Sequence, residues 1–388
     1  MVSSKLPKEM KAQLLPSVNA PYQLTTIPIP TFTAETSPHD ILVRVLAASY
    51  CHTDLVLAQG QMAPFPPSFP HIGCHEFSGE VVSLPEHSLS RYKIGDRVGV
   101  PGRSFHPCGK CFECSREPDN DRNKDADGGG YSVYCVAAGN NGISAPGGFR
   151  EYAIVDSRQV TPLPDEISAV QGASLMCAGI TIYAALKKCG LAKGQRVGIM
   201  GCGGGLGHLG LQFAAKMGLR VLGVDVADGP LQVAREVAEA LHEEEGLVAR
   251  VVDARVIKAE DIVQEIARED QRKDKGDMGL DAVIILPESQ KAFDYGVSLL
   301  RTHGKCVVVS FPAEGFHVSA RDVVFRDISI GGSLVGSNKV LGEMVMFAAA
   351  HNVRTRIKTY PLGQLNDLVL EYKKGKGGKL VIDLTLDD

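Results

Sequence analysis

The segment from residue 195 to residue 226 constrains the fold most, because it joins a strand, a glycine-rich turn, a helix and a second strand. The first strand is QRVGIMG (195–201), the helix is GHLGLQFAAKMG (207–218), and the second strand is LRVLGVDV (219–226). Similar alternation continues to about residue 311. This pattern is typical of parallel βαβ units with right-handed crossovers. The sequence therefore predicts an α/β fold with a doubly wound parallel sheet.

The first 170 residues have a different character. They contain short β-branched runs that Pro and Gly separate, namely DILVRVLAAS (40–49), GEVVSL (79–84), DRVGVP (96–101) and EYAIVD (151–156). The tail after about residue 320 holds a helix near 340–351 and a closing strand, KLVIDL. We predict a β-rich domain from residues 1–177 and 320–388, with a polar lobe at about 104–148, and a nucleotide-binding domain at 178–319.

Composition excludes several classes of protein. The 388 residues carry 41 Lys and Arg against 45 Asp and Glu, a net charge of −4 that offers no basic excess for nucleic acid. The sequence contains no uninterrupted run of about 18 apolar residues, so it predicts no membrane span. The first residues lack the apolar segment of a secretory signal. We expect a cytoplasmic protein, in which the ten cysteines would seldom form disulfides and a cluster of them would indicate a metal site.

The glycine-rich turn predicts a dinucleotide site. Its candidate contacts are Gly201, Gly204, Gly205, Leu206 and Gly207. Glycines let the backbone approach a pyrophosphate that lies at the positive end of the following helix. Asp225, at the end of the next strand, would accept hydrogen bonds from a ribose diol and repel a 2′-phosphate, and the next four residues include no Lys or Arg. We therefore predict NAD; the alternative is a tight turn in an unrelated α/β protein.

Four cysteines of the polar lobe predict a structural metal site. Cys108, Cys111 and Cys114 form a C-x₂-C-x₂-C run, and Cys135 is the candidate for a fourth thiolate. Four thiolates around Zn²⁺ make a closed, tetrahedral site. An iron–sulfur centre is the alternative, although no second cysteine triplet supports it.

A second set of zinc ligands is more scattered. Cys51 and His75 lie in the β-rich half, and Cys177 heads the segment before the nucleotide fold. Two thiolates and one imidazole leave Zn²⁺ one open position, as catalysis requires. Taken singly, a buried Cys is often only a small apolar residue, so the prediction depends on the joint pattern.

The motifs taken together resemble one family. They are CHTD (51–54), GCHEFSGEV (73–81), KIGDRVG (93–99), CGKCFEC (108–114), LMCAGITIYAALK (175–187), GGLG (204–207), VLGVD (221–225), SIGGSLVG and GGKLVIDL. Over nearly the whole chain they are similar to zinc-dependent alcohol dehydrogenases of the medium-chain dehydrogenase/reductase superfamily, and most to its microbial, usually tetrameric branch. The resemblance implies a GroES-like β-rich catalytic domain beside a Rossmann NAD-binding domain, a homo-oligomer (dimer or tetramer), and a small alcohol or aldehyde as substrate.

The resemblance also implies residue roles. Cys51, His75 and Cys177 match the catalytic zinc ligands. The residues around them match a proton-passing hydroxyl, a carboxylate that orients a ligand histidine, and an acid behind the metal; these are Thr53, Asp54 and Glu76. His52 and Lys379 match contacts to the cofactor pyrophosphate, although relatives usually have Arg in place of Lys379. We expect the remaining candidates to bind no metal; these are His71, Cys74, Cys189, Cys202 and Cys306.

Three features depart from the family pattern. Cys135 follows Cys114 after 20 intervening residues, more than in relatives, which indicates an insertion within the loop 115–134. Val56 stands where relatives carry a histidine that ends the proton path. The aromatic residue expected before the structural cysteines is not evident at 102–105, and the chain has no Trp, so substrate size does not carry over.

The predicted reaction is NAD(H)-linked interconversion of an alcohol with an aldehyde or ketone. Zinc would polarise the substrate oxygen and lower the pKa of the alcohol, and Thr53 would take the proton. One alternative is an NADP-linked aldehyde reductase similar to the cinnamyl-alcohol branch. Another is a non-enzymatic zinc- and nucleotide-binding relative, which would be expected to have lost some ligands.

Overall fold

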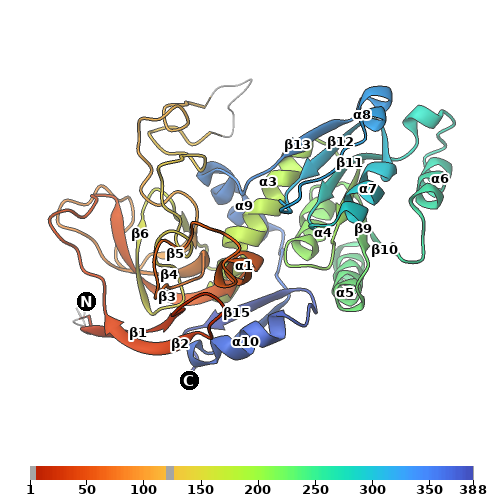
Figure 1. Cartoon of the computed structure of the whole chain (residues 1–388). Helices are drawn as coiled ribbons and strands as arrows, with labels where there is room; N and C mark the ends of the chain where they lie inside the picture. Colours follow the sequence, from red (N-terminus) through yellow and green to blue (C-terminus); the bar gives the residue numbers. More distant parts are fainter. Residues whose placement is uncertain (1–5, 119–125, 388) are drawn as a thin grey trace.

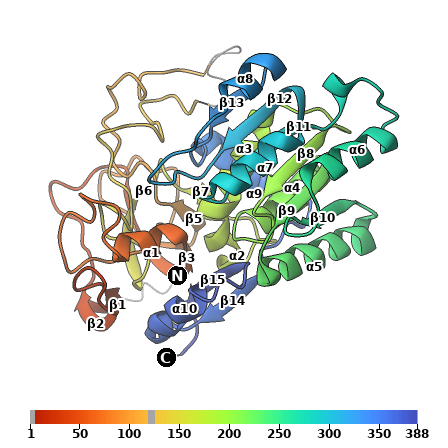
Figure 2. The same ribbon diagram turned by 45° about the vertical axis from the view of Figure 1, so that its right-hand side comes forward.

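The computed structural model describes residues 6–118 and 126–387, and places a strand-rich part beside a parallel sheet covered by helices (Figure 1). Residues 119–125 of the predicted insertion lie outside the described residues. The C-terminal segment, with β14, α10 and β15, returns beneath the strand-rich part, as both ribbon views show (Figures 1 and 2). The predicted fold class, a GroES-like domain with a Rossmann-type parallel sheet, is confirmed.

The parallel sheet has the order β10-β9-β8-β11-β12-β13. Its strands are β8 (Arg196–Met200), β9 (Arg220–Asp225), β10 (Ala249–Asp253), β11 (Leu280–Ile285), β12 (Leu300–Val308) and β13 (Ser329–Gly332). Every residue of β8 and β11 is buried, as expected for central strands with helices on both faces. The strand order reverses between β8 and β11, and in open α/β sheets ligands bind at the carboxyl ends of the strands at such a point.

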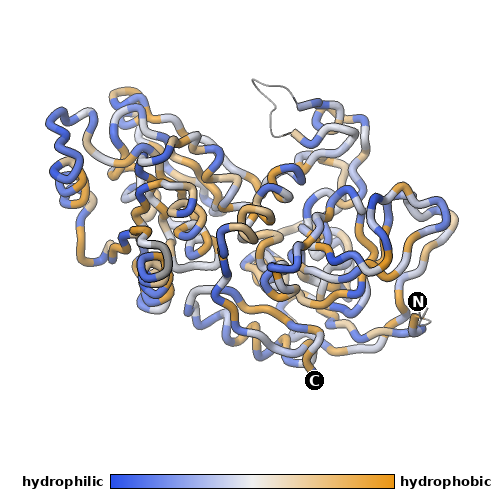
Figure 3. Tube along the Cα trace, turned by 180° about the vertical axis from the view of Figure 1, so that it is seen from behind, coloured by the Kyte–Doolittle hydropathy of each residue, from blue (hydrophilic) through white to orange (hydrophobic). Residues whose placement is uncertain are grey.

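Helices cover both faces of this sheet. They are α3 (Ile180–Cys189), α4 (Gly207–Lys216), α5 (Asp228–Glu245), α6 (Ala259–Glu269), α7 (Gln290–Leu299), α8 (Ala320–Arg326) and α9 (Asn338–Ala350). One core contains side chains of α3, α4, α5 and α9, and the core on the opposite face contains those of α6 and α7. Apolar segments concentrate in the interior strands, and polar ones on the outer helices (Figure 3).

The strand-rich part is built on a second, mixed sheet in the order β14-β15-β3-β4-β5-β7, with β6 paired to β3. Its strands are β3 (Asp40–Tyr50), β4 (Glu76–Ser83), β5 (Arg97–Pro101), β6 (Tyr152–Asp156), β7 (Thr161–Pro162), β14 (Ile357–Tyr360) and β15 (Lys379–Asp383). A separate hairpin is formed by β1 (Glu9–Leu14) and β2 (Gln23–Pro28). The remaining helices of this part are α1 (His52–Ala58), α2 (Ala169–Ser174) and α10 (Leu365–Tyr372).

Two details differ from the expectations. The parallel sheet includes β13, which lies beyond residue 319, where we expected the nucleotide-binding domain to end. The stretch Ala169–Cys189 has the length and mean hydropathy (1.5) of a membrane span, yet 72% of its apolar window is buried inside the protein. Because its side chains contribute to the main hydrophobic core, this stretch is accounted for as a core helix.

Candidate active site

Three elements bring Cys51, His75 and Cys177 together. Cys51 follows β3 and begins α1, and His75 immediately precedes β4. Cys177 lies in a π-helical turn (Leu175–Gly179) between α2 and α3, a distortion that is frequent at functional sites because it redirects a side chain. One ligand atom from each residue lies within 4.8 Å of the others. The geometry fits a single metal ion with three protein ligands.

The charges of these residues depend on one another. A hydrogen bond from the Cys177 thiol, followed by the charge of His75, holds the pKa of Cys51 well below its usual range, and the pKa of Cys177 is raised by the same hydrogen bond. Burial alone would lower the pKa of His75, but the charge and hydrogen bond of Cys51, together with the charges of Asp54 and Glu76, raise the pKa to about 9. The buried Nδ1 of His75 has no hydrogen-bond partner among the described residues. Such a donor set is suited to Zn²⁺.

Asp54 ties the loop of Cys51 to the loop of His75. Its side chain is 1% exposed. It accepts hydrogen bonds from the backbone N–H of Cys51 (2.9 Å) and of Cys74 (2.8 Å), and its Oδ2 lies 3.8 Å from Nδ1 of His75. The carboxylate therefore fixes both loops and lies where it can orient the imidazole.

Glu76 and Lys379 form a buried ion pair behind the three ligands. The Lys379 ammonium contacts the Glu76 carboxylate and donates a 2.9 Å hydrogen bond to the carbonyl of Tyr50. Burial raises the pKa of Glu76, and the charge and hydrogen bond of Lys379 oppose that rise and favour the ionised pair. Lys379, expected at the pyrophosphate, thus directs its ammonium towards Glu76, and only its stem approaches Gly205.

The residues that follow Cys51 lie on α1. The Thr53 hydroxyl is 3.9 Å from the Cys51 sulfur. His52 is exposed, with Nε2 4.0 Å from a carboxylate oxygen of Glu288. Val56 is half-buried on the same helix. Just before the structural cysteines, where the expected aromatic residue is not evident, the ring of Phe105 stacks on the imidazole of His106 at 3.8 Å.

A groove of about 330 Å³ runs from these residues along the glycine-rich turn. One end is lined by Cys51 and His52, and the other by Asp225 and Pro230; between them lie Gly201, Gly204, Gly205, Leu206 and Gly207. It occupies the point where the sheet order reverses, since Leu286 and Pro287, just after β11, also line it.

The turn itself is closely packed. Gly201 has φ +79°, and a Cβ at Gly203 would lie 1.7 Å from the carbonyl oxygen of Pro230, so only glycine fits there. Asp225 accepts hydrogen bonds from the N–H of Gly203 (3.1 Å) and of Val226 (2.9 Å). The cradle fits a dinucleotide, whose pyrophosphate would lie at the N-terminus of α4.

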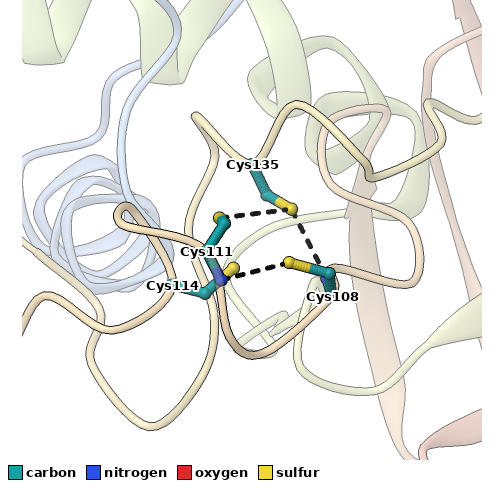
Figure 4. Close-up of side chains that lie close together, drawn as sticks. All are labelled: Cys108, Cys111, Cys114 and Cys135. Carbon is teal, nitrogen blue, oxygen red and sulfur yellow. Dashed lines mark hydrogen bonds between the residues drawn. The ribbon is translucent and has the colours of Figure 1, made fainter.

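Cys108, Cys111, Cys114 and Cys135 converge in the lobe (Figure 4), with their sulfur atoms within 4.8 Å of one another. The backbone N–H of Cys108 donates to the sulfur of Cys135, and that of Cys111 to the sulfur of Cys108, both at 3.4 Å. Hydrogen bonds from the backbone of Lys110 and of Cys111 lower the pKa of Cys108 to about 6. Zn–S bonds of about 2.3 Å give tetrahedral S···S distances of about 3.8 Å. A multi-iron cluster would hold its thiolates farther apart, so one tetrahedral ion fits better.

The remaining candidates lie elsewhere. Within residues 6–118 and 126–387, neither group includes any of the side chains that we expected to bind no metal, namely His71, Cys74, Cys189, Cys202 and Cys306. Nε2 of His71 faces the carbonyl of Gly142 at 3.1 Å. The sequence reasoning missed Gly203, Tyr50 and Tyr372 in and around the groove. The run GCGGGLG could have indicated Gly203, but no local signal marks the tyrosines.

The comparisons agree with this site. A family profile described as "Alcohol dehydrogenase GroES-like domain" matches residues 37–165, and one described as "Zinc-binding dehydrogenase" matches residues 205–350. An alcohol dehydrogenase of Moraxella sp. (strain TAE123) is 33% identical over 97% of this chain and 100% of its own, and one of Geobacillus stearothermophilus is 33% identical over 96% and 99%.

A solved structure extends the likeness to three dimensions. The alcohol dehydrogenase of the hyperthermophilic archaeon Aeropyrum pernix has a TM-score of 0.76 and 28% identity, covering 96% of this chain and 99% of that one. Both domains and nearly the full length are therefore matched. The chain belongs to the zinc-binding alcohol dehydrogenases of the medium-chain dehydrogenase/reductase superfamily.

Proposed function

We propose that this protein is a zinc-dependent, NAD(H)-linked alcohol dehydrogenase that interconverts a small alcohol with its aldehyde or ketone. The observation that carries the proposal is the meeting of Cys51, His75 and Cys177 at one end of the glycine-lined groove. Two thiolates and an imidazole with an open position form a catalytic rather than a structural zinc site. A non-catalytic relative would not be expected to keep all three.

The protein's own groups have separate tasks in this mechanism. When bound, zinc supplies Lewis-acid polarisation of the substrate oxygen, and NAD supplies the hydride chemistry. Thr53 accepts the hydroxyl proton of the substrate and passes it outward. Asp54 fixes the loops of Cys51 and His75 through backbone hydrogen bonds and places its charge 3.8 Å from the imidazole, and Lys379 compensates the buried charge of Glu76. We also assign His52 and Lys379 to the pyrophosphate; for Lys379 this requires its ammonium to turn from Glu76.

A second zinc is proposed at Cys108, Cys111, Cys114 and Cys135. Their convergence supports a closed site with no position for substrate. The lobe has few apolar residues, so metal binding would supply folding free energy that burial does not. The chain would then hold two zinc ions, one catalytic and one structural.

NAD is the proposed cofactor because Asp225 lies at the ribose end of the groove. One observation favours the NADP-linked alternative. Arg255 follows β10, directly beside the end of β9, where the N–H of Ala254 donates to the carbonyl of Asp225. However, its guanidinium is already paired with Asp253 at 2.7 Å and with Asp228 at 2.5 Å. These carboxylates oppose a 2′-phosphate, so NAD remains the proposal.

The deciding experiment is a panel of alcohols and aldehydes assayed with both cofactors at the reduced-nicotinamide absorbance. We expect turnover that Cys177→Ser abolishes and that chelation of the exposed zinc abolishes as well. Cys306→Ser, which removes a buried thiol that belongs to neither metal group, is the control and should keep activity. No turnover with any substrate, in protein that contains two zinc ions, would contradict the proposal.

The assembly and domain limits are further proposals. We propose a homo-oligomer, dimer or tetramer, in the cytoplasm. Support comes from β13, which pairs only with β12 among the described residues, and from Phe325 of α8, which is 81% exposed. We retain residues 1–177 and 320–388 as the catalytic domain and 178–319 as the NAD-binding domain, joined by a sheet that continues into β13.

A further inference from the structure

Tyr372 ends α10 and forms part of the wall of the groove, together with Gly378 and Lys379. Its ring meets that of Tyr50 edge-on, with centroids 5.0 Å apart and an interplanar angle of 63°. Tyr50 in turn stacks on the buried ring of Phe149 at 6.2 Å. Such aromatic contacts favour one geometry, so the orientation of the Tyr372 ring is set by the core of the catalytic domain.

The position of Tyr372 along the groove follows from its contact with Tyr50, which directly precedes Cys51 in the sequence. Lys379, which also lines the groove, donates to the carbonyl of the same Tyr50. Burial raises the pKa of Tyr372. The hydroxyl therefore lies nearer the catalytic end and stays protonated, able both to donate and to accept a hydrogen bond.

This hydroxyl is available to a ligand. Within residues 6–118 and 126–387, no protein group forms a hydrogen bond with it. The Tyr50 hydroxyl also lacks a partner, but it is fully buried, and Tyr50 as a residue is 1% exposed. Tyr372 is half-exposed. Leu286 and Pro287, which also line the groove, offer apolar side chains only.

We propose that Tyr372 positions the dinucleotide by a hydrogen bond between its phenol and the hydroxyls of the nicotinamide-side ribose. A dinucleotide whose adenosine ribose meets Asp225 and whose pyrophosphate meets the glycine-rich turn brings its second ribose to the Cys51 end of the groove. That ribose would present two hydroxyls within the part of the groove that Tyr372 lines. The inference rests on the proposed function, because it requires the groove to hold a dinucleotide.

Equilibrium binding to the zinc-loaded protein tests the assignment. Calorimetry would measure the binding of NADH, ADP-ribose and ADP to the wild type, to Tyr372→Phe and to Tyr92→Phe. ADP-ribose carries the second ribose, and ADP lacks it. Tyr372→Phe keeps the ring and should weaken NADH and ADP-ribose about three- to tenfold, the range of one net hydrogen bond, and leave ADP unchanged. Tyr92→Phe, which removes a buried hydroxyl that donates to the carbonyl of Val160 and does not line the groove, should bind all three like the wild type.

Two results would overturn the proposal while leaving the enzyme assignment in place. One is wild-type affinity of Tyr372→Phe for ADP-ribose. The other is an equal loss of affinity for ADP and for ADP-ribose in Tyr372→Phe, which would show that the substitution disturbs the groove as a whole. A wild-type protein that binds neither NADH nor ADP-ribose would instead refute the proposed function, and this inference with it.

Discussion

Replacing Asp54 by asparagine tests the link between the zinc loops. The carboxylate accepts backbone N–H groups of Cys51 and Cys74, at 2.9 and 2.8 Å, with no exposure to water to compensate. Asparagine can accept only one of them, and its NH₂ group faces the other N–H. A hydrogen bond to a charged group is worth about 1.5–3 kcal/mol, and an unpaired buried donor costs about 1–3 kcal/mol. Removing a buried charge offsets part of this cost, so we expect the free energy of unfolding to fall by about 2–4 kcal/mol.

Asp281→Asn is the matched control for Asp54→Asn. Asp281 is also buried and accepts the backbone N–H of Arg196 at 2.7 Å, but it lies in the parallel sheet away from the metal ligands. Urea unfolding should show a similar loss of stability in both variants. Timed release of zinc to a chromogenic chelator should be faster only in Asp54→Asn, for one of the two ions, since loss of such a supporting group typically weakens zinc about 10–100-fold. Wild-type stability and wild-type zinc release in Asp54→Asn would refute the reasoning.

Four further predictions concern other parts of the chain. Cys135→Ser should release one zinc and destabilise the protein, and metal analysis that finds two tightly bound zincs in it would exclude the assigned tetrad. The wild type should have a higher kcat/KM with NADH than with NADPH. Asp225→Ala should weaken the binding of NADH and reduce the difference in kcat/KM between the two cofactors; a wild type with the higher kcat/KM for NADPH would contradict the ribose assignment. Thr53→Ala should lower kcat by a factor of about 10²–10⁴ with bound zinc unchanged. Val56→His should raise the rate of alcohol oxidation below neutral pH if proton release limits the rate. A pH–rate series tests both variants, and an unchanged kcat of Thr53→Ala at every pH would exclude the proton path. Hydrogen bonds from its arginine partners lower the pKa of Asp270 to about 2, so its ionised form stabilises the fold above about pH 4, and that stability is lost as the pH falls towards 2. Asp270→Asn should lower the free energy of unfolding by about 2 kcal/mol at pH 7. Urea midpoints of wild type and variant that differ equally at pH 7 and pH 2.5 would contradict this.

Much of the fold is encoded locally in the sequence. The alternation of strands and helices after residue 195, the glycines of the turn and the position of Asp225 depend on neighbours within about 30 residues. Periodicity and turn chemistry are properties of such short segments, which is why the parallel sheet could be predicted. The C-x₂-C-x₂-C run is local as well, since two intervening residues allow consecutive thiolates to face one ion.

Other features were decided only by tertiary packing. The π-helical turn that directs Cys177 towards Cys51 is not marked by its own residues. The Lys379 ammonium turns to Glu76, a carboxylate 303 residues away in the sequence, because a buried carboxylate requires an opposite charge beside it.

Long-range placement also adds groups to the cofactor site. Arg255 comes to the end of β9 because β10 pairs with β9 in parallel, although the residues that follow Asp225 in sequence contain no cation. Tyr372 reaches the groove because α10 packs its ring on Tyr50, from the opposite end of the chain. Contacts of this kind depend on which faces of distant elements meet, and that is settled by burial of the whole core rather than by the pattern of any one segment.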